Sequence, residues 1–243
     1  GTFTVTDADI SDTISATVES VEITNGGTFD GTVPAELTAN SNQVLQNMLS
    51  LSSAADTSAL NFANNSYLEA DSTGLRNTAE FTISLWMNPD RVNKHGADLV
   101  GQDNCVEMTM INDRLRMWTP RTGNFYFDSS RAAITAGQWT HITVTGNAAA
   151  GQMKLYADGE LIETWNHGSK VNYGDSHTLQ KIRAGNKVSG SGSYGFEGKL
   201  DNISVWTTAR TAEQVEQLYS SSPSGDEAGL LGYWALSEGS GTT

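Results

Sequence analysis

Short stretches in which apolar and polar residues alternate constrain the fold of this chain more than any other feature. Alternation with a period of two is typical of a β-strand that buries one face. Ten or more short strands separated by turns predict an all-β fold, an antiparallel sandwich or jelly roll. The stretches are ALNFA (59–63), SYLEA (66–70), FTISLWMNP (81–89), CVEMTMI (105–111), RLRMWT (114–119), FYFDS (125–129), WTHITVTGN (139–147), GQMKLYADGELIETW (151–165), HTLQKIRAGN (177–186) and GKLDNISVWT (198–207).

Two local motifs make specific predictions within this series. Asp158 and Gly159 lie between two alternating runs, and Asp-Gly is a preferred pair for a two-residue hairpin turn. The segment TAEQVEQLY (211–219) has helical spacing, and it is the one convincing helix of this part of the chain. Thr211 followed three residues later by Gln214 predicts a capping box at its start.

Residues 1–57 differ from the rest because they contain no Trp, Tyr, Lys, Arg or His. Alternation over residues 3–23 predicts two or three strands, and apolar residues at helical spacing follow in 44–49. So few large side chains would bury only a thin core. We therefore expect residues 1–57 to form a separate segment, half of a split domain or one that leans on its neighbour. We expect residues 58–243 to form the main domain.

Composition excludes several classes of protein. The net charge of −14 argues against binding a nucleic-acid backbone, which needs clustered Lys and Arg. The single cysteine, Cys105, cannot form an internal disulfide. No run of 18 apolar residues predicts a membrane-spanning helix. The sequence starts within an alternating run, so we expect the chain to be a piece of a longer protein.

A catalytic set is not evident in the sequence. Glycosidases that retain configuration need two carboxylates about 5–5.5 Å apart. Glu160 and Glu163 come closest, but in a regular strand residues three apart point to opposite faces. Cys105 has no recognisable nucleophile motif around it. We therefore predict that the domain is not an enzyme.

The order of several phrases resembles the laminin-G-like, concanavalin-A-like jelly-roll family, which includes pentraxins. This resemblance implies two curved antiparallel sheets and a module that binds sugars or proteins. The phrases are ALNFANNSYLEA, FTISLWMNPD, GQWTHITVTGN, GQMKLYADGELI, GKLDNISVWTTARTAEQVEQLY and GLLGYWALSEGSG, which lie between residues 59 and 241.

Residues 1–57 resemble the cadherin-like repeats of large RTX-type bacterial surface adhesins through the phrase VTDAD…DT. The resemblance implies a small Ig-like or cadherin-like β segment and a secreted protein on the bacterial cell surface. Asp7, Asp9 and Asp12 place three carboxylates within six residues, which repel one another without a counterion. In such repeats a cluster of this kind holds calcium, so we expect these three residues to be metal ligands.

The pentraxin resemblance assigns calcium to Asp103 and Asn104 in the phrase GQDNCVEM. Calcium prefers six to eight oxygen ligands, and Asp and Asn side chains supply them. Asn186 remains as a further oxygen donor in the partner loop, but Lys187 beside it would repel a cation. We expect one ion rather than two, incompletely coordinated until a ligand arrives. The alternative is an Asx turn that caps a strand.

A second calcium site is implied at Asp201, in the phrase GKLDNISVW. In the family this aspartate joins oxygens of an early turn, which reads NFANNSY in this chain. Asn64 and Asn65 occupy the turn, so the expected ligands are their side chains or backbone carbonyls. The alternative is a surface acid that hydrogen-bonds to a loop.

Aromatic residues suggest where a sugar would bind. Trp118 precedes a Pro-Arg-Thr-Gly turn with Tyr126 beyond it, and Arg121 and Asn124 lie nearby. A sugar stacks a C–H face on an aromatic ring while polar side chains bind its hydroxyls. We expect these four residues to contact a ligand, although Trp118 at a strand end could instead be a half-buried plug. Trp86, Trp139 and Trp206 are expected to serve packing.

The loop WNHGSKVNYGDSH is rich in hydrogen-bonding groups, which is typical of a ligand rim. His167 and Tyr173 are its candidate contacts, and the alternative is a solvated loop. These expectations combine into a non-catalytic, calcium-assisted lectin module of a bacterial surface adhesin, monomeric within a larger chain, with a glycan as its partner. The alternatives are a peptide- or protein-binding module and an accessory domain of a secreted polysaccharide-degrading enzyme.

Overall fold

The computed structural model describes residues 59–63, 66–70, 74–92, 97–111, 114–128, 132, 134–174, 181–186 and 195–236. The chain divides into two units, Gly1–Ser50 and Leu51–Thr243, and every described residue belongs to the second. The expectations for residues 1–57, including Asp7, Asp9 and Asp12, lie outside the described residues, as do those for Asn64 and Asn65. Among the described residues, no helix is long and apolar enough to cross a membrane.

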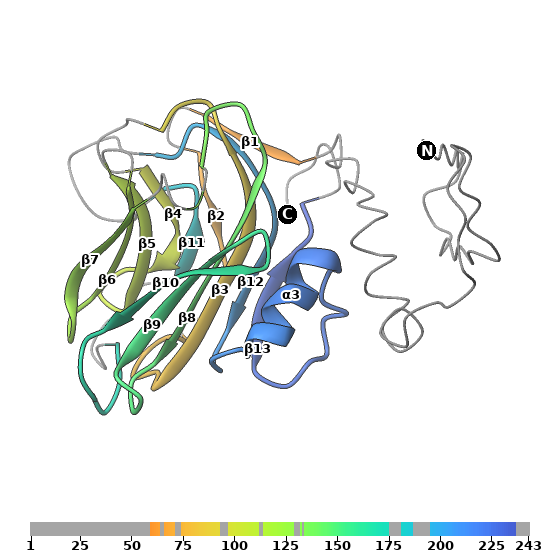
Figure 1. The fold of residues 1–243 in the computed structure, drawn as a ribbon. Coiled ribbons are helices and arrows are strands. Elements are labelled where there is room, and N and C mark those ends of the chain that lie inside the picture. The colour runs from red at the N-terminus through yellow and green to blue at the C-terminus, as the bar shows by residue number, and fades with distance from the viewer. Residues whose placement is uncertain are drawn as a thin grey trace, which may run out of the picture. The chain divides into compact units, whose positions relative to one another are not determined.

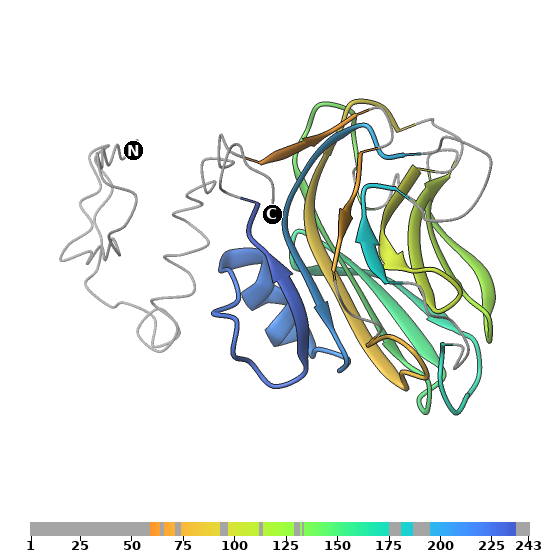
Figure 2. The same cartoon turned by 180° about the vertical axis from the view of Figure 1, so that it is seen from behind.

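The described part is a sandwich of two antiparallel sheets (Figures 1 and 2). The seven-stranded sheet consists of β1 (Leu60–Phe62), β3 (Glu80–Pro89), β8 (Thr140–Asn147), β9 (Gln152–Ala157), β10 (Glu160–Asn166), β12 (Gly198–Trp206) and β13 (Leu230–Trp234). Its order is β1-β12-β3-β8-β9-β10, and β13 also pairs with β12. The all-β sandwich predicted from the sequence is therefore confirmed for this part of the chain.

The six-stranded sheet faces the first one. It consists of β2 (Leu68–Glu69), β4 (Ala97–Gln102), β5 (Val106–Ile111), β6 (Arg114–Thr119), β7 (Gly123–Asp128) and β11 (Ile182–Ala184). Its order is β2-β11-β4-β5-β6-β7, so segments far apart in sequence, such as β11 and β4, lie side by side. Strand β4 was not among the predicted stretches, because Asp98 and Gly101 interrupt its apolar pattern.

Alternating side chains of both sheets fill the space between them. In β3 the inward residues include Phe81, Ile83 and Leu85, all fully buried. Val106 and Met108 of β5 belong to the same core cluster. Because neighbouring residues of a strand point to opposite faces, the remaining residues of each strand form the outer face of its sheet.

The Asp158-Gly159 hairpin is confirmed between β9 and β10. Both residues have positive φ angles, 48° and 84°, which the two central positions of a type I′ turn require. The expectation that Glu160 and Glu163 point to opposite faces is wrong, because the strand register shifts between Leu161 and Glu163. Glu160 and Glu163 lie opposite Ala157 and Leu155, which share one face, because the bulge inserts an extra residue between them.

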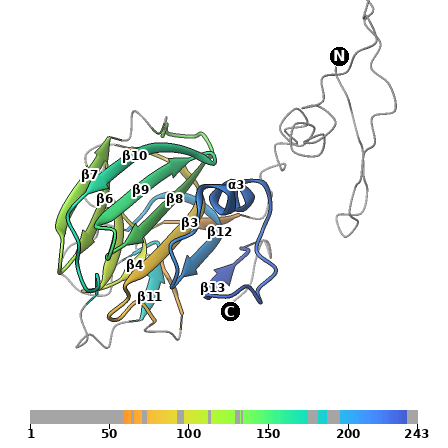
Figure 3. The same ribbon diagram turned by 60° about the horizontal axis from the view of Figure 1, so that its bottom comes forward.

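The predicted helix is α3 (Ala212–Ser220), and its capping box is confirmed. The Thr211 side chain accepts a hydrogen bond from the Gln214 backbone N–H, and the Gln214 side chain accepts one from the Thr211 N–H. The helix lies against the outer face of the seven-stranded sheet (Figure 3), where Tyr219 stacks on Trp86 with 5.4 Å between ring centroids. Trp206 is fully buried, and the Arg210 guanidinium lies 4.1 Å from its ring centroid.

Candidate functional site

The β4–β5 connection is a tight turn formed by Gln102, Asp103, Asn104 and Cys105. The Cys105 N–H donates a hydrogen bond to the Gln102 carbonyl at 3.0 Å, which closes the turn. Asn104, the third residue, has φ 61°, a conformation that Asn tolerates and that a type II turn requires at this position. Asp103 is buried and Asn104 is exposed, so the two side chains have different surroundings.

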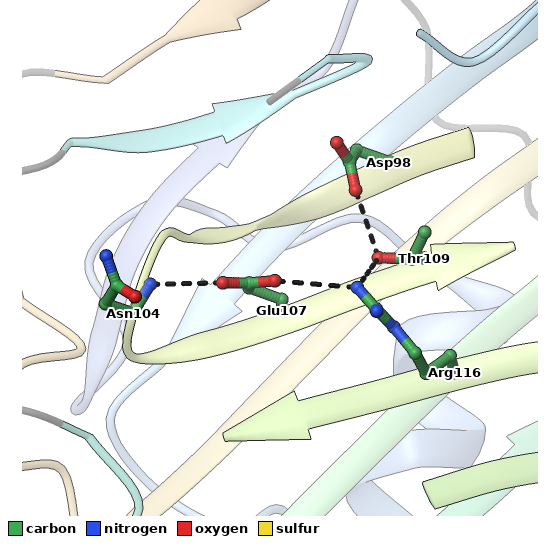
Figure 4. Close-up of polar contacts among 5 residues, drawn as sticks. All are labelled: Asp98, Asn104, Glu107, Thr109 and Arg116. Atoms are coloured by element: carbon green, nitrogen blue, oxygen red, sulfur yellow. Dashed lines mark hydrogen bonds and ion pairs between the residues drawn. The ribbon is translucent and has the colours of Figure 1, made fainter. Parts of the chain in front are cut away.

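A chain of polar contacts leads from this turn across the outer face of the six-stranded sheet (Figure 4). The Asn104 N–H donates to Glu107 Oε1 at 3.1 Å, and Glu107 Oε2 lies 3.5 Å from the Arg116 guanidinium. Arg116 also donates to Thr109 Oγ1 at 3.0 Å, and Thr109 donates to Asp98 Oδ1 at 3.1 Å. Three adjacent strands thus hold their polar side chains in fixed positions.

The aromatic candidates continue the same outer face. Trp118 of β6 lies opposite Glu107 on one side and opposite Asn124 of β7 on the other. Tyr126 lies opposite Arg116, one step along the strands. Trp118 is half-buried, whereas the Tyr126 side chain is 41% exposed. The structure therefore brings together the predicted Trp118, Asn124 and Tyr126 beside a polar network.

Arg121 lies in the β6–β7 turn and is exposed. The turn around it is closed by Thr119, whose hydroxyl lies 2.8 Å from the Thr122 hydroxyl and accepts the Thr122 N–H. Arg121 is therefore at the end of the two strands that carry Trp118 and Tyr126. Its position is compatible with contact to a ligand that extends past the strand ends.

A small pocket opens next to the β4–β5 turn. Its volume is about 30 Å³, enough for an ion or one or two water molecules but not for a sugar ring. Two predicted residues, Asp103 and Asn186, line it together. The other polar residues that line it are Asp98, Glu107, Lys181 and Arg183.

The described residues fit a calcium ion only in part. Asp103 and Asn186 could each supply an oxygen to an ion in the pocket, but Lys181 and Arg183 line the same pocket and would oppose a cation. No group of three or more His, Cys, Asp or Glu residues in the described ranges is arranged to hold a metal ion. Calcium at Asp103 and Asn104 therefore stays a prediction.

Asp201 lies apart from this face, on β12 of the seven-stranded sheet. It is buried, and its carboxylate accepts a hydrogen bond from the Asn202 N–H at 2.9 Å. Asn202 takes a φ angle of 48°, so the carboxylate stabilises a local irregularity of the strand. The calcium predicted at Asp201 depended on Asn64, which lies outside the described residues, so that prediction stays open.

His167 and Tyr173 form a cluster of their own. Tyr173 is fully buried, its ring is edge-on to Phe81 at 5.2 Å, and its hydroxyl donates to the Gln152 carbonyl at 2.8 Å. The prediction that Tyr173 contacts a ligand at a rim is therefore wrong, because its ring is buried in the hydrophobic core. His167 is half-buried with Nε2 2.9 Å from the Tyr173 hydroxyl, and burial is the main reason that its pKa is lowered.

Sequence reasoning missed an aromatic residue on the other side of the pocket. Tyr67, just before β2, is 49% exposed, and the Arg183 guanidinium lies 4.0 Å from its ring centroid. Glu69 holds Arg183 in place through contacts of 2.8 Å and 2.6 Å, and Lys181 lies 3.3 Å from the same carboxylate. The Arg183 hydrogen bond is the main reason that the pKa of Glu69 is lowered. The alternation in SYLEA indicates that Tyr67 and Glu69 share a face of the strand. It does not indicate that this strand pairs with β11, which carries Arg183.

Comparison with known proteins gives a family and many structural neighbours. The family profile described as the concanavalin A-like lectin/glucanases superfamily, of laminin G type, matches residues 62–216, more than half of the chain. A protein of Bacteroides ovatus described as a candidate carbohydrate-binding protein superposes with a TM-score of 0.62 at 19% identity. That match covers 74% of this chain and 51% of the other, so this chain spans about half the length of the Bacteroides protein.

The second neighbour is the heptameric SAP-like pentraxin of Limulus polyphemus. Its TM-score is 0.52 at 21% identity, and the match covers 73% of this chain and 89% of the pentraxin. A search of curated protein sequences finds no match. At these identities the neighbours establish the sandwich fold, and the site described above stands on its own geometry.

Proposed function

Because the chain belongs to the concanavalin A-like lectin/glucanase superfamily, we propose that it is a non-catalytic carbohydrate-binding module. The proposed binding surface is the outer face of the six-stranded sheet, from β4 to β7. One observation carries the proposal: Trp118, Asn124 and Tyr126 lie side by side with polar groups that are already held in place by one another. The neighbour described as a candidate carbohydrate-binding protein supports the same class of ligand.

The chemistry of this face suits a sugar. A sugar ring has an apolar C–H surface and a rim of hydroxyls, and Trp and Tyr provide a flat apolar surface with a polar edge. Arg116, which is half-buried next to Trp118, would offer a donor to a sugar hydroxyl without reorganisation, because Thr109 and Glu107 already hold it in place. Fixed side chains lower the entropy lost on binding.

Glu107 is already committed to contacts within the protein. Its carboxylate accepts the Asn104 N–H and pairs with Arg116, which suits a fixed binding surface. The superfamily includes glucanases, so the measurement that matters is release of reducing ends from polysaccharides by the pure chain, which we expect to be zero.

Calcium assistance is a separable part of the proposal. Asp103, Asn104 and Asn186 would hold the ion, which when bound would offer coordination sites to sugar hydroxyls. Chelation with EDTA and the substitution Asp103→Asn should then both weaken glycan binding while the chain stays folded. Glycan affinity that survives both treatments would remove calcium from the account and leave the aromatic face as the site.

We further propose that the module acts outside the cell, as part of a bacterial surface adhesin that attaches to glycans. The net charge of −14 and the adhesin-like phrase in residues 1–57 support this setting. Asp7, Asp9 and Asp12 would stiffen that segment with calcium, and Asp201 would hold a structural ion. Secretion of the full-length protein and its detection on intact cells would test the setting.

A glycan array probed with the 243-residue chain tests the proposed function. We expect binding to one or more glycans and about tenfold or greater loss of affinity in Trp118→Ala and Tyr126→Ala, as for aromatic residues central to an interface. Leu161→Ala is the matched control, because Leu161 is 51% exposed on β10 of the other sheet. An array without hits, together with a peptide hit, would instead favour a protein-binding module.

A further inference from the structure

We infer that the outer face of the six-stranded sheet binds a stretch of an uncharged glycan chain that crosses the strands, stacked on Trp118 at one end and on Tyr67 at the other. This inference rests on the proposed function and names its class of ligand. Four properties of the face carry it: the alignment of side chains across the strands, the spacing of two aromatic residues, a gap between them and the pairing of charges.

The strand pairings align one residue from each strand in a single row across the sheet. Glu69 lies opposite Arg183, which lies opposite Gly101, and Gly101 lies opposite Glu107. Glu107 lies opposite Trp118, which lies opposite Asn124. We call these residues the transverse row: Glu69, Arg183, Gly101, Glu107, Trp118 and Asn124. A ligand that follows the row crosses all six strands.

Two aromatic side chains lie far apart along this row. Trp118 belongs to it on β6, and Tyr67 covers the Arg183 guanidinium on β11. Three strand spacings separate β11 from β6, which corresponds to about 14 Å at ~4.8 Å per strand. One sugar ring cannot stack on both aromatic residues, whereas a chain of several sugars can.

Gly101 leaves a gap in the middle of the row. A Cβ atom there would come within 2.4 Å of the Val106 carbonyl oxygen and 2.9 Å of Glu107 Cα, so the close approach of β5 excludes a side chain. Gly101 lines the small pocket of about 30 Å³, which is too small to enclose a terminal sugar. A ligand must therefore lie across this position instead of inserting one residue into a hole.

Charges at the centre of the face are paired within it, whereas Arg114 of β6 and Arg121 of the β6–β7 turn are exposed toward its ends. Glu69 pairs with Arg183 and Lys181, Glu107 pairs with Arg116, and Asp98 accepts a hydrogen bond from Thr109. A carboxylated or sulfated glycan would have to compete with these carboxylates for the cations and would meet a chain of net charge −14. An uncharged chain requires no such exchange.

Chain length and charge of the ligand provide the test. The probes are gluco-, xylo- and manno-oligosaccharides of one to six sugars, with heparin and polygalacturonate as charged comparisons, titrated calorimetrically against the 243-residue chain. We expect affinity for at least one neutral series to rise from the disaccharide to the hexasaccharide. We expect it to change less than twofold between low and high salt, and the charged polymers to bind more weakly.

Tyr67→Ala separates the two ends of the row. It should weaken hexasaccharide binding about tenfold while changing disaccharide binding less than twofold, because a disaccharide on Trp118 does not reach Tyr67. Trp118→Ala should weaken both. Val171→Ala, at a position 88% exposed and outside the row, should change neither.

The outcomes separate this inference from the proposed function. If a monosaccharide binds as tightly as a hexasaccharide, if charged polymers bind best with strong salt dependence, or if Tyr67→Ala leaves hexasaccharide affinity intact, the inference is wrong and the module still binds glycans. If no carbohydrate binds, or if Trp118→Ala leaves the affinity for every bound carbohydrate unchanged, the proposed function at this face fails as well.

Discussion

The outer faces of the two sheets carry similar residue types and yet have different surroundings. On the seven-stranded sheet, Trp206 is fully buried and Trp86 stacks on Tyr219 of α3. On the six-stranded sheet, Trp118 is half-buried and Tyr126 is 41% exposed. The helix and the residues just before it account for the difference, because Tyr219 of α3 packs on Trp86 and Arg210 lies over the Trp206 ring.

The polar groups of the two outer faces also differ, because those next to Trp86 are neutral and those next to Trp118 form an ion pair. Beneath Tyr219 and next to Trp86 they are uncharged: Thr143 donates to the Ser84 hydroxyl, which lies 2.9 Å from His141 Nε2. Burial lowers the pKa of His141 to about 3, so the imidazole is neutral at neutral pH. On the six-stranded sheet Glu107 and Arg116 form an ion pair with 3.5 Å between their charged groups. Trp86 therefore lies beside neutral polar groups under α3, whereas Trp118 lies beside a fixed ion pair on an uncovered face.

The largest effect that separates the faces should be on stability. Trp206→Ala removes a fully buried side chain and should lower the free energy of unfolding by about 3–5 kcal/mol. Trp118→Ala, at a half-buried position, should lower it by about 1 kcal/mol. Urea unfolding of both variants measures the difference. Equal losses of unfolding free energy in the two variants would mean that Trp206 and Trp118 do not differ in how well they are packed.

The next largest effect should be a loss of stability at acid pH that is caused by the buried His141. The pKa of His141 falls from 6.5 to about 3 on folding, so between these pH values the unfolded chain binds more protons and stability decreases as pH falls. Between about pH 6.5 and 4.5 this group should remove roughly 2–3 kcal/mol from the free energy of unfolding. His141→Gln keeps a hydrogen-bonding group near Ser84 but does not titrate. If the variant loses as much stability as the parent chain over this range, His141 is not the cause.

The smallest of these effects concerns the helix that covers the first face. Thr211→Ala removes the capping side chain and should lower the free energy of unfolding by about 1 kcal/mol. Thr211→Ser keeps the hydroxyl and serves as the control, with a loss well below that of alanine. Equal losses in both variants would show that the hydroxyl of the capping box does not stabilise α3.

Local patterns predicted the local structure of this chain well. The Asp158-Gly159 hairpin and the Thr211 capping box each depend on neighbouring residues, and both are confirmed. Strand β4 was missed because Asp98 and Gly101 interrupt its alternation, and the register of Glu163 was mistaken because a bulge follows Leu161. Irregularities of this kind are set by pairing with other strands, which alternation within one segment does not encode.

The candidate site depended even more on distant pairing. Trp118, Asn124 and Tyr126 were predicted together because they lie on adjacent strands of one hairpin. Tyr67 and Arg183 were missed because their place on the face requires β2 and β11 to pair with each other and β11 with β4. Tyr173 was misplaced because a polar loop sequence does not reveal that one of its aromatic rings reaches the core.

The indole N–H signals of the six tryptophans test the central claim most directly. In ¹H–¹⁵N spectra of the 243-residue chain titrated with the best-binding oligosaccharide, the Trp118 signal should shift progressively, whereas those of Trp86 and Trp206 should stay in place. Assignment follows from single Trp→Phe variants. A shift of the Trp86 or Trp206 signal with Trp118 unchanged would place the ligand on the helix-covered sheet and contradict the account.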